Sequence, residues 1–233
     1  MSTHLDITDI DVDGAVREAA EAVSGDTRLA FLRKAGITGV TALSGGALLG
    51  AMLPGSAVAA TGSGRPPASF GPGDVGIFNY ALTLEYLEAN FYAQAVANIK
   101  FTDAHLAALA KVIAGHEADH VVYLKKALGS KAVAKPKFDF GDAVTNQAKF
   151  TATSQVLENT GVGAYFGQAF NFAKAADLKA AVSVLTIEAR HAGAIGYYND
   201  PTAKAISPNG AFDKPLTAAT VLTAVKGTKF IVS

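Results

Sequence analysis

Residues 115–124 read GHEADHVVYL and place a glutamate and a histidine three positions apart inside an apolar helical pattern. This pattern starts at the cap residues 102–103, ends at Gly129, and repeats its hydrophobic side chains with the period of an α-helix. Glu117 and His120 fall within the inward stripe of the predicted helix. Side chains three positions apart on a helix are neighbours, so these two can bind one ion together.

The same pattern occurs twice in the chain. A second Glu-x-x-His unit lies at 188–191, and two further helical patterns each carry a glutamate followed seven residues later by a tyrosine. The glutamates and tyrosines repeat after 73 residues, and the Glu-x-x-His units repeat after 71. The two halves of the helical region therefore match, which predicts a pseudo-twofold arrangement. The matched residues are Glu85, Tyr92, Glu117 and His120, followed by Glu158, Tyr165, Glu188 and His191.

Glutamate is scarce in the helical region, although it is a good helix former. Only five occur after residue 60, all on inward stripes, where an unpaired carboxylate costs on the order of several kcal/mol. Two Glu-x-x-His helices and one glutamate from each of two other helices form the ligand set of a carboxylate-bridged dimetal centre. Oxygen and imidazole ligands favour two iron or manganese ions over metals that prefer soft ligands. The predicted metal ligands are Glu85, Glu117, His120, Glu158, Glu188 and His191.

The spacing leaves several assignments open. Glu88 lies one turn beyond Glu85 and could be the ligand in its place, although the repeat selects Glu85. Tyr92 and Tyr165 are either plain core residues or catalytic side chains that hydrogen-bond to ligand carboxylates. The same buried residues could also form a polar network in a bundle that has lost its metal.

Residues next to the predicted ligands are interpreted differently. His116, Asp119 and Arg190 fall on other helix faces, which places them on the surface or beside the ligands, and His105 is expected on the surface at a helix start. The glycines of GVGAYFG (161–167) each cost about 1 kcal/mol of helix propensity. Close helix packing is their favoured role, and a route for a small oxidant is the alternative.

Four helical patterns with short, long and short connections predict an all-α fold, a four-helix bundle of two antiparallel pairs joined by one long crossover. We expect the bundle at 73–199 and its third helix at about 147–173. The long connection carries Pro136 as a helix breaker. The C-terminal tail, 200–233, is expected to contain a short capping helix near 216–225.

Residues 1–59 are predicted to be a lead segment followed by an export signal. Basic residues precede the uncharged stretch 35–64, and Ala-Val-Ala at 57–59 offers a cleavage site. The stretch TRLAFLRKAG (27–36) resembles the twin-arginine export signal, with Leu29 in place of the second arginine. The protein is therefore expected in the periplasm, in the cell envelope or outside the cell.

An uncleaved signal is the alternative, because the apolar residues 35–53 could tether the chain to a membrane. The Gly- and Pro-containing residues 60–72 read as a linker to the bundle.

Composition limits the possible functions. The chain has no cysteine, which excludes disulfides, thiolate metal sites and cysteine nucleophiles, and argues against a cysteine-ligated iron domain. The formal net charge is zero, so charge gives no argument for a nucleic-acid partner. Metal ions and a small oxidant are the expected partners, and an oligomer is possible.

Four segments together resemble the ferritin-like superfamily, and in particular its exported, desiccation-related ferritin-like domain proteins. They read NYALTLEYLEANFY, HEADH, LENTGVGAY and IEARHAG. The resemblance implies a four-helix bundle with a dinuclear iron site held by the six predicted ligands. It also implies an oxidoreductase that acts on dioxygen, peroxide or ferrous iron under oxidative or desiccation stress. The alternatives are metal storage without turnover and a structural stress protein with a vestigial site.

Overall fold

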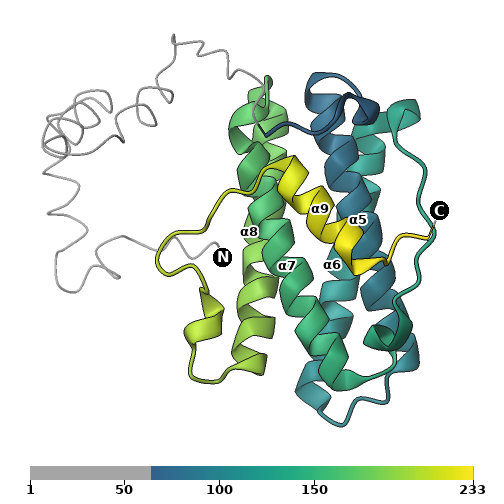
Figure 1. The fold of residues 1–233 in the computed structure, drawn as a ribbon, viewed down its shortest axis with the longest axis vertical. Helices are drawn as coiled ribbons and strands as arrows, with labels where there is room; N and C mark the ends of the chain where they lie inside the picture. Colours follow the sequence, from purple (N-terminus) through teal and green to yellow (C-terminus); the bar gives the residue numbers. More distant parts are fainter. Residues whose placement is uncertain (1–63, 233) are drawn as a thin grey trace, which may run out of the picture. The chain divides into compact units, whose positions relative to one another are not determined.

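The structure, a computed structural model, describes residues 64–232 and contains five α-helices in that range (Figure 1). Over the same residues, β pairing is limited to one isolated antiparallel bridge between Phe138 and Ile231. The predicted all-α bundle is therefore confirmed. The helices are α5 (Gly73–Asn98), α6 (Ala104–Leu128), α7 (Gln147–Gln168), α8 (Ala175–Asn199) and α9 (Ala218–Thr228).

Capping side chains define where several helices begin. Asp103 accepts hydrogen bonds from two backbone N–H groups in the first turn of α6, at 2.8 and 3.1 Å, as the cap at 102–103 predicts. Asn146 before α7 and Thr217 before α9 each accept one such bond, at 3.0 and 3.1 Å. Each of these three helices therefore starts at a side chain that accepts hydrogen bonds from one or two of the free N–H groups in its first turn.

The long helices form two pairs, as predicted. Helix α5 packs on α6 and α7 packs on α8, each pair being joined by a short connection, whereas residues 129–146 cross from one pair to the other. Helix α9 lies obliquely across the front of the bundle in the view of Figure 1 and contacts α7. The tail after α9 holds the crossover, because Asp139 N–H donates to the Phe230 carbonyl and Val232 N–H to the Lys137 carbonyl, both at 2.9 Å.

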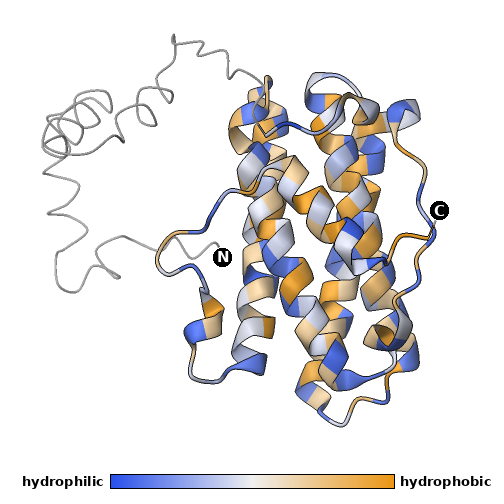
Figure 2. Cartoon of the chain, viewed as in Figure 1, coloured by the Kyte–Doolittle hydropathy of each residue, from blue (hydrophilic) through white to orange (hydrophobic). Residues whose placement is uncertain are grey.

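The interior contains two apolar clusters, and the long helices that form them also bury glutamates. On α5, Leu82 belongs to one cluster, Phe91 belongs to the other, and the buried Glu85 lies between them in the chain. On α7, Leu157 and Tyr165 belong to different clusters and enclose Glu158 in the same way. Hydrophobic and hydrophilic residues are therefore intermingled along the long helices (Figure 2).

Glycines of α7 allow the C-terminal segment to lie close to the bundle. A Cβ atom at Gly163 would lie 2.6 Å from the Leu216 side chain, and one at Gly167 would overlap the Leu216 carbonyl oxygen. The Leu216 N–H donates to the Gly163 carbonyl at 2.9 Å, which fixes this approach. The close-packing interpretation of the glycines in 161–167 is thus confirmed for these two.

The predicted third helix at 147–173 was too long at its C-terminal end. Helix α7 ends at Gln168, and a 3-10 turn, Ala169–Asn171, follows it. The Asp74 carboxylate of α5 accepts the N–H groups of residues 173 and 174 at 2.8 and 3.0 Å. These bonds to another helix replace the bonds that would have continued α7. The capping helix is also displaced, since α9 begins two residues and ends three residues after the predicted limits 216–225.

The described part of the predicted linker packs against the bundle. The Gly64 carbonyl accepts hydrogen bonds from Gln168 Nε2 at 2.6 Å and from Ala218 N–H at 3.0 Å. The predicted lead segment, export signal and membrane tether lie outside the described residues and stay predictions. Within residues 64–232, no helix has the length and apolar character needed to cross a bilayer.

Candidate metal centre

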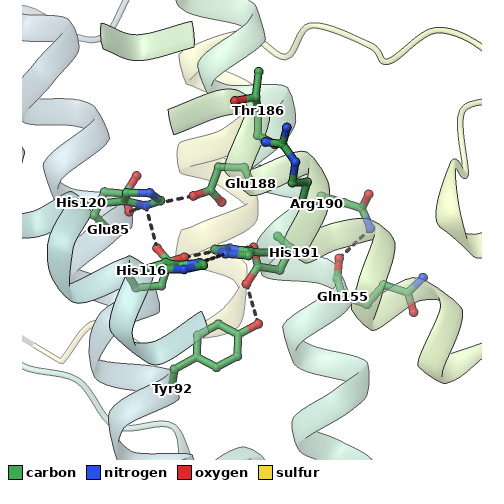
Figure 3. A network of polar contacts seen from close by, with 12 residues as sticks. Glu85, Tyr92, His116, His120, Gln155, Thr186, Glu188, Arg190 and His191 are labelled. Atoms are coloured by element: carbon green, nitrogen blue, oxygen red, sulfur yellow. Dashed lines mark hydrogen bonds and ion pairs between the residues drawn. The ribbon is translucent and has the colours of Figure 1, made fainter. Parts of the chain in front are cut away.

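The structure brings all six predicted ligand side chains together in the interior of the bundle. The four glutamates are fully buried, His191 is 4% exposed, and the His120 side chain is 11% exposed. Figure 3 shows several of them converging from different helices. Their positions follow from the repeat, because each helix turns its glutamate stripe inward. The contributions are Glu85 from α5, Glu117 and His120 from α6, Glu158 from α7, and Glu188 and His191 from α8.

These side chains form two overlapping sets of possible metal ligands. Each set contains three glutamates and one histidine, whose ligand atoms all lie within 4.8 Å of one another. Glu117 and Glu188 belong to both sets. Glu85 and His120 complete one set, which we call position A, and Glu158 and His191 complete the other, position B. The bundle therefore contains two groups of side chains that could each hold a metal ion and that share two carboxylates.

Glu117 faces both histidines at once. Its Oε1 atom lies 3.0 Å from Nδ1 of His191, and its Oε2 atom lies 3.4 Å from Nδ1 of His120. The His120 nitrogen also lies 3.2 Å from Glu85 and 3.3 Å from Glu188, and the His191 nitrogen lies 3.3 Å from Glu158. Both imidazoles therefore turn Nδ1 toward the carboxylates, and Glu117 is placed to bridge the two positions.

Many polar atoms of this cluster have no hydrogen-bond partner. They include both carboxylate oxygens of Glu117 and of Glu188, one oxygen of Glu158, and Nδ1 of His191. Buried polar atoms normally find partners, and a buried unpaired charge is costly. Two divalent cations would supply these partners and balance the charge of four carboxylates. The donor set therefore fits a pair of metal ions.

Comparison with known proteins agrees with this geometry. Residues 73–199 match the sequence model of the family described as ferritin-like domain. The chain belongs to this family. The ferritin-like part of the resemblance is thus confirmed, whereas the exported, desiccation-related type stays a prediction. None of the curated proteins compared with the chain matches it.

In this ferritin-like domain, each tyrosine of the repeat contacts the glutamate of the other half. The Tyr92 hydroxyl donates to Glu158 Oε1 and the Tyr165 hydroxyl donates to Glu85 Oε1, both at 2.5 Å. Both tyrosines are buried. The sequence left open whether these tyrosines are plain core residues or hydrogen-bond to ligand carboxylates, and the structure shows hydrogen bonds to two candidate ligands. It fixes the orientation of the two carboxylates that are not shared.

Burial and mutual repulsion make the metal-free centre hold protons. Burial, and then the charge of Glu85, raise the pKa of Glu117 well above its usual value, and burial with the charge of Glu117 does the same for Glu188. Burial would also raise the pKa of Glu85, but the hydrogen bond and charge of His120 lower it. Burial would lower the pKa of His120, yet the nearby carboxylates of Glu117, Glu188 and Glu85 raise it to about 12. Metal ions must displace these protons in order to bind.

We expect the metal-free protein to have a higher melting temperature at about pH 5 than at about pH 8. Carboxyl groups with a raised folded pKa contribute stability that is full below about pH 4.5 and is lost as the pH rises toward that folded pKa. The raised pKa of His120 acts in the same direction above about pH 6.5. Glu85, with its lowered pKa, opposes this trend only below about pH 4.5.

Thermal denaturation in the presence of a chelator measures this dependence. A Glu188→Gln variant is the matched control, because it removes one of the protonated carboxyl groups, and its melting temperature should vary less with pH. A wild-type protein that is more stable at pH 8 would contradict the prediction.

Glu88 is a fifth buried glutamate and belongs to neither set of ligands. Its repeat counterpart, 73 positions later, is Gly161. A Cβ atom at Gly161 would lie 2.7 Å from Glu188 Oε2 and 3.5 Å from Glu88 Oε1. Glu88 and Gly161 also line a small cavity of about 10 Å³, roughly the room for one water molecule. The third glycine of α7 therefore makes space for carboxylates.

Of the residues that neighbour the ligands in sequence, one contacts the centre. His116 is solvent-exposed, yet its Nδ1 atom lies 2.9 Å from Nε2 of His191. His116 lies four positions before His120 and so shares its helix face, which the interpretation of the sequence missed, although this spacing does not identify His191 as the partner. Arg190 instead donates to the Thr186 carbonyl of its own helix at 2.9 Å, and Asp119 and His105 are exposed.

Proposed function

We propose that this ferritin-like domain binds two iron or manganese ions and reacts them with dioxygen or peroxide. The observation that carries the proposal is the position of Glu117, whose two oxygens face the histidines of positions A and B. A carboxylate shared in this way suits two cations that are close together. The unpartnered oxygens of Glu188, which also belongs to both sets, support the same interpretation.

The donor types support iron or manganese over other metals. Each position offers three carboxylates and one imidazole. Hard oxygen ligands with imidazole suit these metals, whereas sites for softer ions usually include thiolates, and the chain has no cysteine. Four carboxylates balance the charge of two divalent ions.

The residues around such a centre would have different roles. Glu117 and Glu188 would bridge the ions, while Glu85 with His120 and Glu158 with His191 would complete positions A and B. Tyr92 and Tyr165 hold the two unshared carboxylates in place through their hydroxyl groups. The two apolar clusters on either side limit the access of water.

Two bound metal ions would supply two electrons, one from each ion, which with two protons reduce peroxide to two water molecules. Within the chain, the hydroxyl groups of Tyr92 and Tyr165 hold protons next to this position, whereas Glu117 and Glu188 would have lost theirs on binding the ions. Removal of peroxide or ferrous iron by this chemistry is consistent with a role in oxidative or desiccation stress.

Metal analysis of the full-length chain tests the proposal. Protein purified in air without chelators, or loaded anaerobically with ferrous or manganous ions, is expected to contain nearly two metal ions per chain. Repeated consumption of peroxide by the loaded protein would indicate an enzyme, and one stoichiometric oxidation followed by arrest would indicate storage. A chain that retains no iron or manganese after loading would refute both functions and leave a structural role.

A further inference from the structure

The two metal positions differ in what supports their histidines. His191 of position B turns Nδ1 toward Glu117 and Glu158, at 3.0 and 3.3 Å, and its other ring nitrogen, Nε2, lies 2.9 Å from Nδ1 of His116. The rings of His116 and His191 are nearly parallel, with centroids 5.1 Å apart and an angle of 13° between their planes (Figure 3). His116 therefore contacts the nitrogen of His191 that does not face the carboxylates.

The contact determines how a neutral His191 can carry its proton. If Nδ1 gives its lone pair to a metal ion, the proton must be on Nε2. The Nε2–H group then donates to Nδ1 of His116, which accepts. A hydrogen bond to the outer nitrogen of a ligand histidine fixes its tautomer and ring orientation and strengthens its bond to the metal.

Among residues 64–232, no side chain is found hydrogen-bonded to the outer nitrogen of His120, the histidine of position A. The Glu-x-x-His units repeat after 71 residues, so the counterpart of His116 is Ile187, which precedes Glu188 as His116 precedes Glu117. An isoleucine side chain has no hydrogen-bonding atom and cannot support the outer nitrogen of His120. The repeat is therefore broken at one pair of residues directly beside the centre.

Other features near the centre are largely matched, although Nδ1 of His120 lies within 3.4 Å of three glutamates and Nδ1 of His191 within 3.3 Å of two. Tyr92 and Tyr165 make matched hydrogen bonds, one to the unshared glutamate of each position. Glu88 lies near Glu188, which both positions share. The contact with His116 differs from these features in that it engages the outer ring nitrogen of one ligand histidine.

We propose that His116 is a positioning residue that acts through His191 and makes position B bind divalent metal ions more tightly than position A. This inference rests on the proposed function, because it concerns the affinities of the same two positions. Partners of ligand histidines are typically worth about 10- to 100-fold in metal affinity. The two metal ions are therefore expected to bind in two separate steps, position B first.

Anaerobic titration of the metal-free, full-length chain with Co²⁺, followed by visible absorption and calorimetry, tests this inference. Wild type should bind two ions with resolved affinities. His116→Ala should weaken the tighter step about 10- to 100-fold and leave the other step unchanged. His116→Asn should restore most of the lost affinity, because the oxygen of the asparagine side chain can accept the hydrogen bond from Nε2–H of His191 in place of Nδ1.

Variants of Ile187 provide the matched control on the other helix. Ile187→Ala should change neither step, whereas Ile187→Asn should strengthen the weaker step by giving His120 a partner. The melting temperature of metal-free His116→Ala should stay close to that of wild type, because His116 is exposed.

Two equal affinities in wild type would overturn the inference, and so would a His116→Ala variant that binds both ions as wild type does. Equal weakening of both steps without recovery in His116→Asn would show a general structural role instead and would also overturn it. A wild-type chain that binds neither Co²⁺ nor iron would overturn the proposed function itself, together with this inference.

Discussion

A chain that carries both Glu117→Ala and Glu188→Ala is expected to retain almost no metal after loading and desalting. These residues are two of the four candidate ligands at each position, because both belong to both sets. Structural zinc sites with four ligands bind with roughly 10–16 kcal/mol, and on that scale the loss of half the ligands should weaken each position by roughly 10³-fold or more. Metal content per chain, measured by elemental analysis, gives the result directly.

Glu88→Gln is the matched control for this variant. Glu88 is also a buried glutamate of the same interior, but it is a member of neither ligand set. The Glu88→Gln variant should therefore keep nearly two ions per chain. If this variant lost its metal, Glu88 would have to be counted as a ligand. The metal-free double variant should remain folded, because removing buried carboxylates that lack partners relieves a cost. Full metal retention in the folded double variant would refute the ligand assignment.

The fold could be predicted from the sequence because its main signals are local. Apolar side chains at the helical period and caps such as Asp103 define individual helices, and the lengths of the connections define how they pair. The end of the third helix could not be predicted in this way. Residues 173 and 174 leave the helix because they bond to Asp74, about one hundred positions earlier, and such a contact has no local signature.

The site was predictable to the extent that the repeat describes it. Spacing places Glu117 and His120 on one helix face, and the repeat finds their counterparts on α8. Spacing does not give the rotation of one helix against another. For this reason neither the bridging position of Glu117 nor the contact between His116 and His191 could be predicted, since both join side chains of different helices.

Gly167→Ala is expected to destabilise the protein by about 2–3 kcal/mol, which corresponds to roughly 5–10 °C in melting temperature. The added Cβ atom would overlap the carbonyl oxygen of Leu216, which is backbone and cannot turn away as a side chain can. The segment is also held on both sides. The Leu216 N–H donates to the Gly163 carbonyl at 2.9 Å, and the Ala218 N–H donates to the Gly64 carbonyl at 3.0 Å. If the segment at Leu216 moved away from the added Cβ atom, the hydrogen bonds that attach the start of α9 to the bundle would therefore lengthen or break.

Gly115→Ala separates this effect from the general effect of a methyl group in a helix. Gly115 lies in the interior of α6, is exposed, and has no atom within 4 Å of an added Cβ. Alanine has the better helix propensity by about 1 kcal/mol, so this variant should be more stable than wild type. Thermal denaturation of both metal-free variants should thus give shifts of opposite sign. A Gly167→Ala variant as stable as Gly115→Ala would mean that the segment before α9 is not held against α7, and the close approach at Leu216 would have to be abandoned.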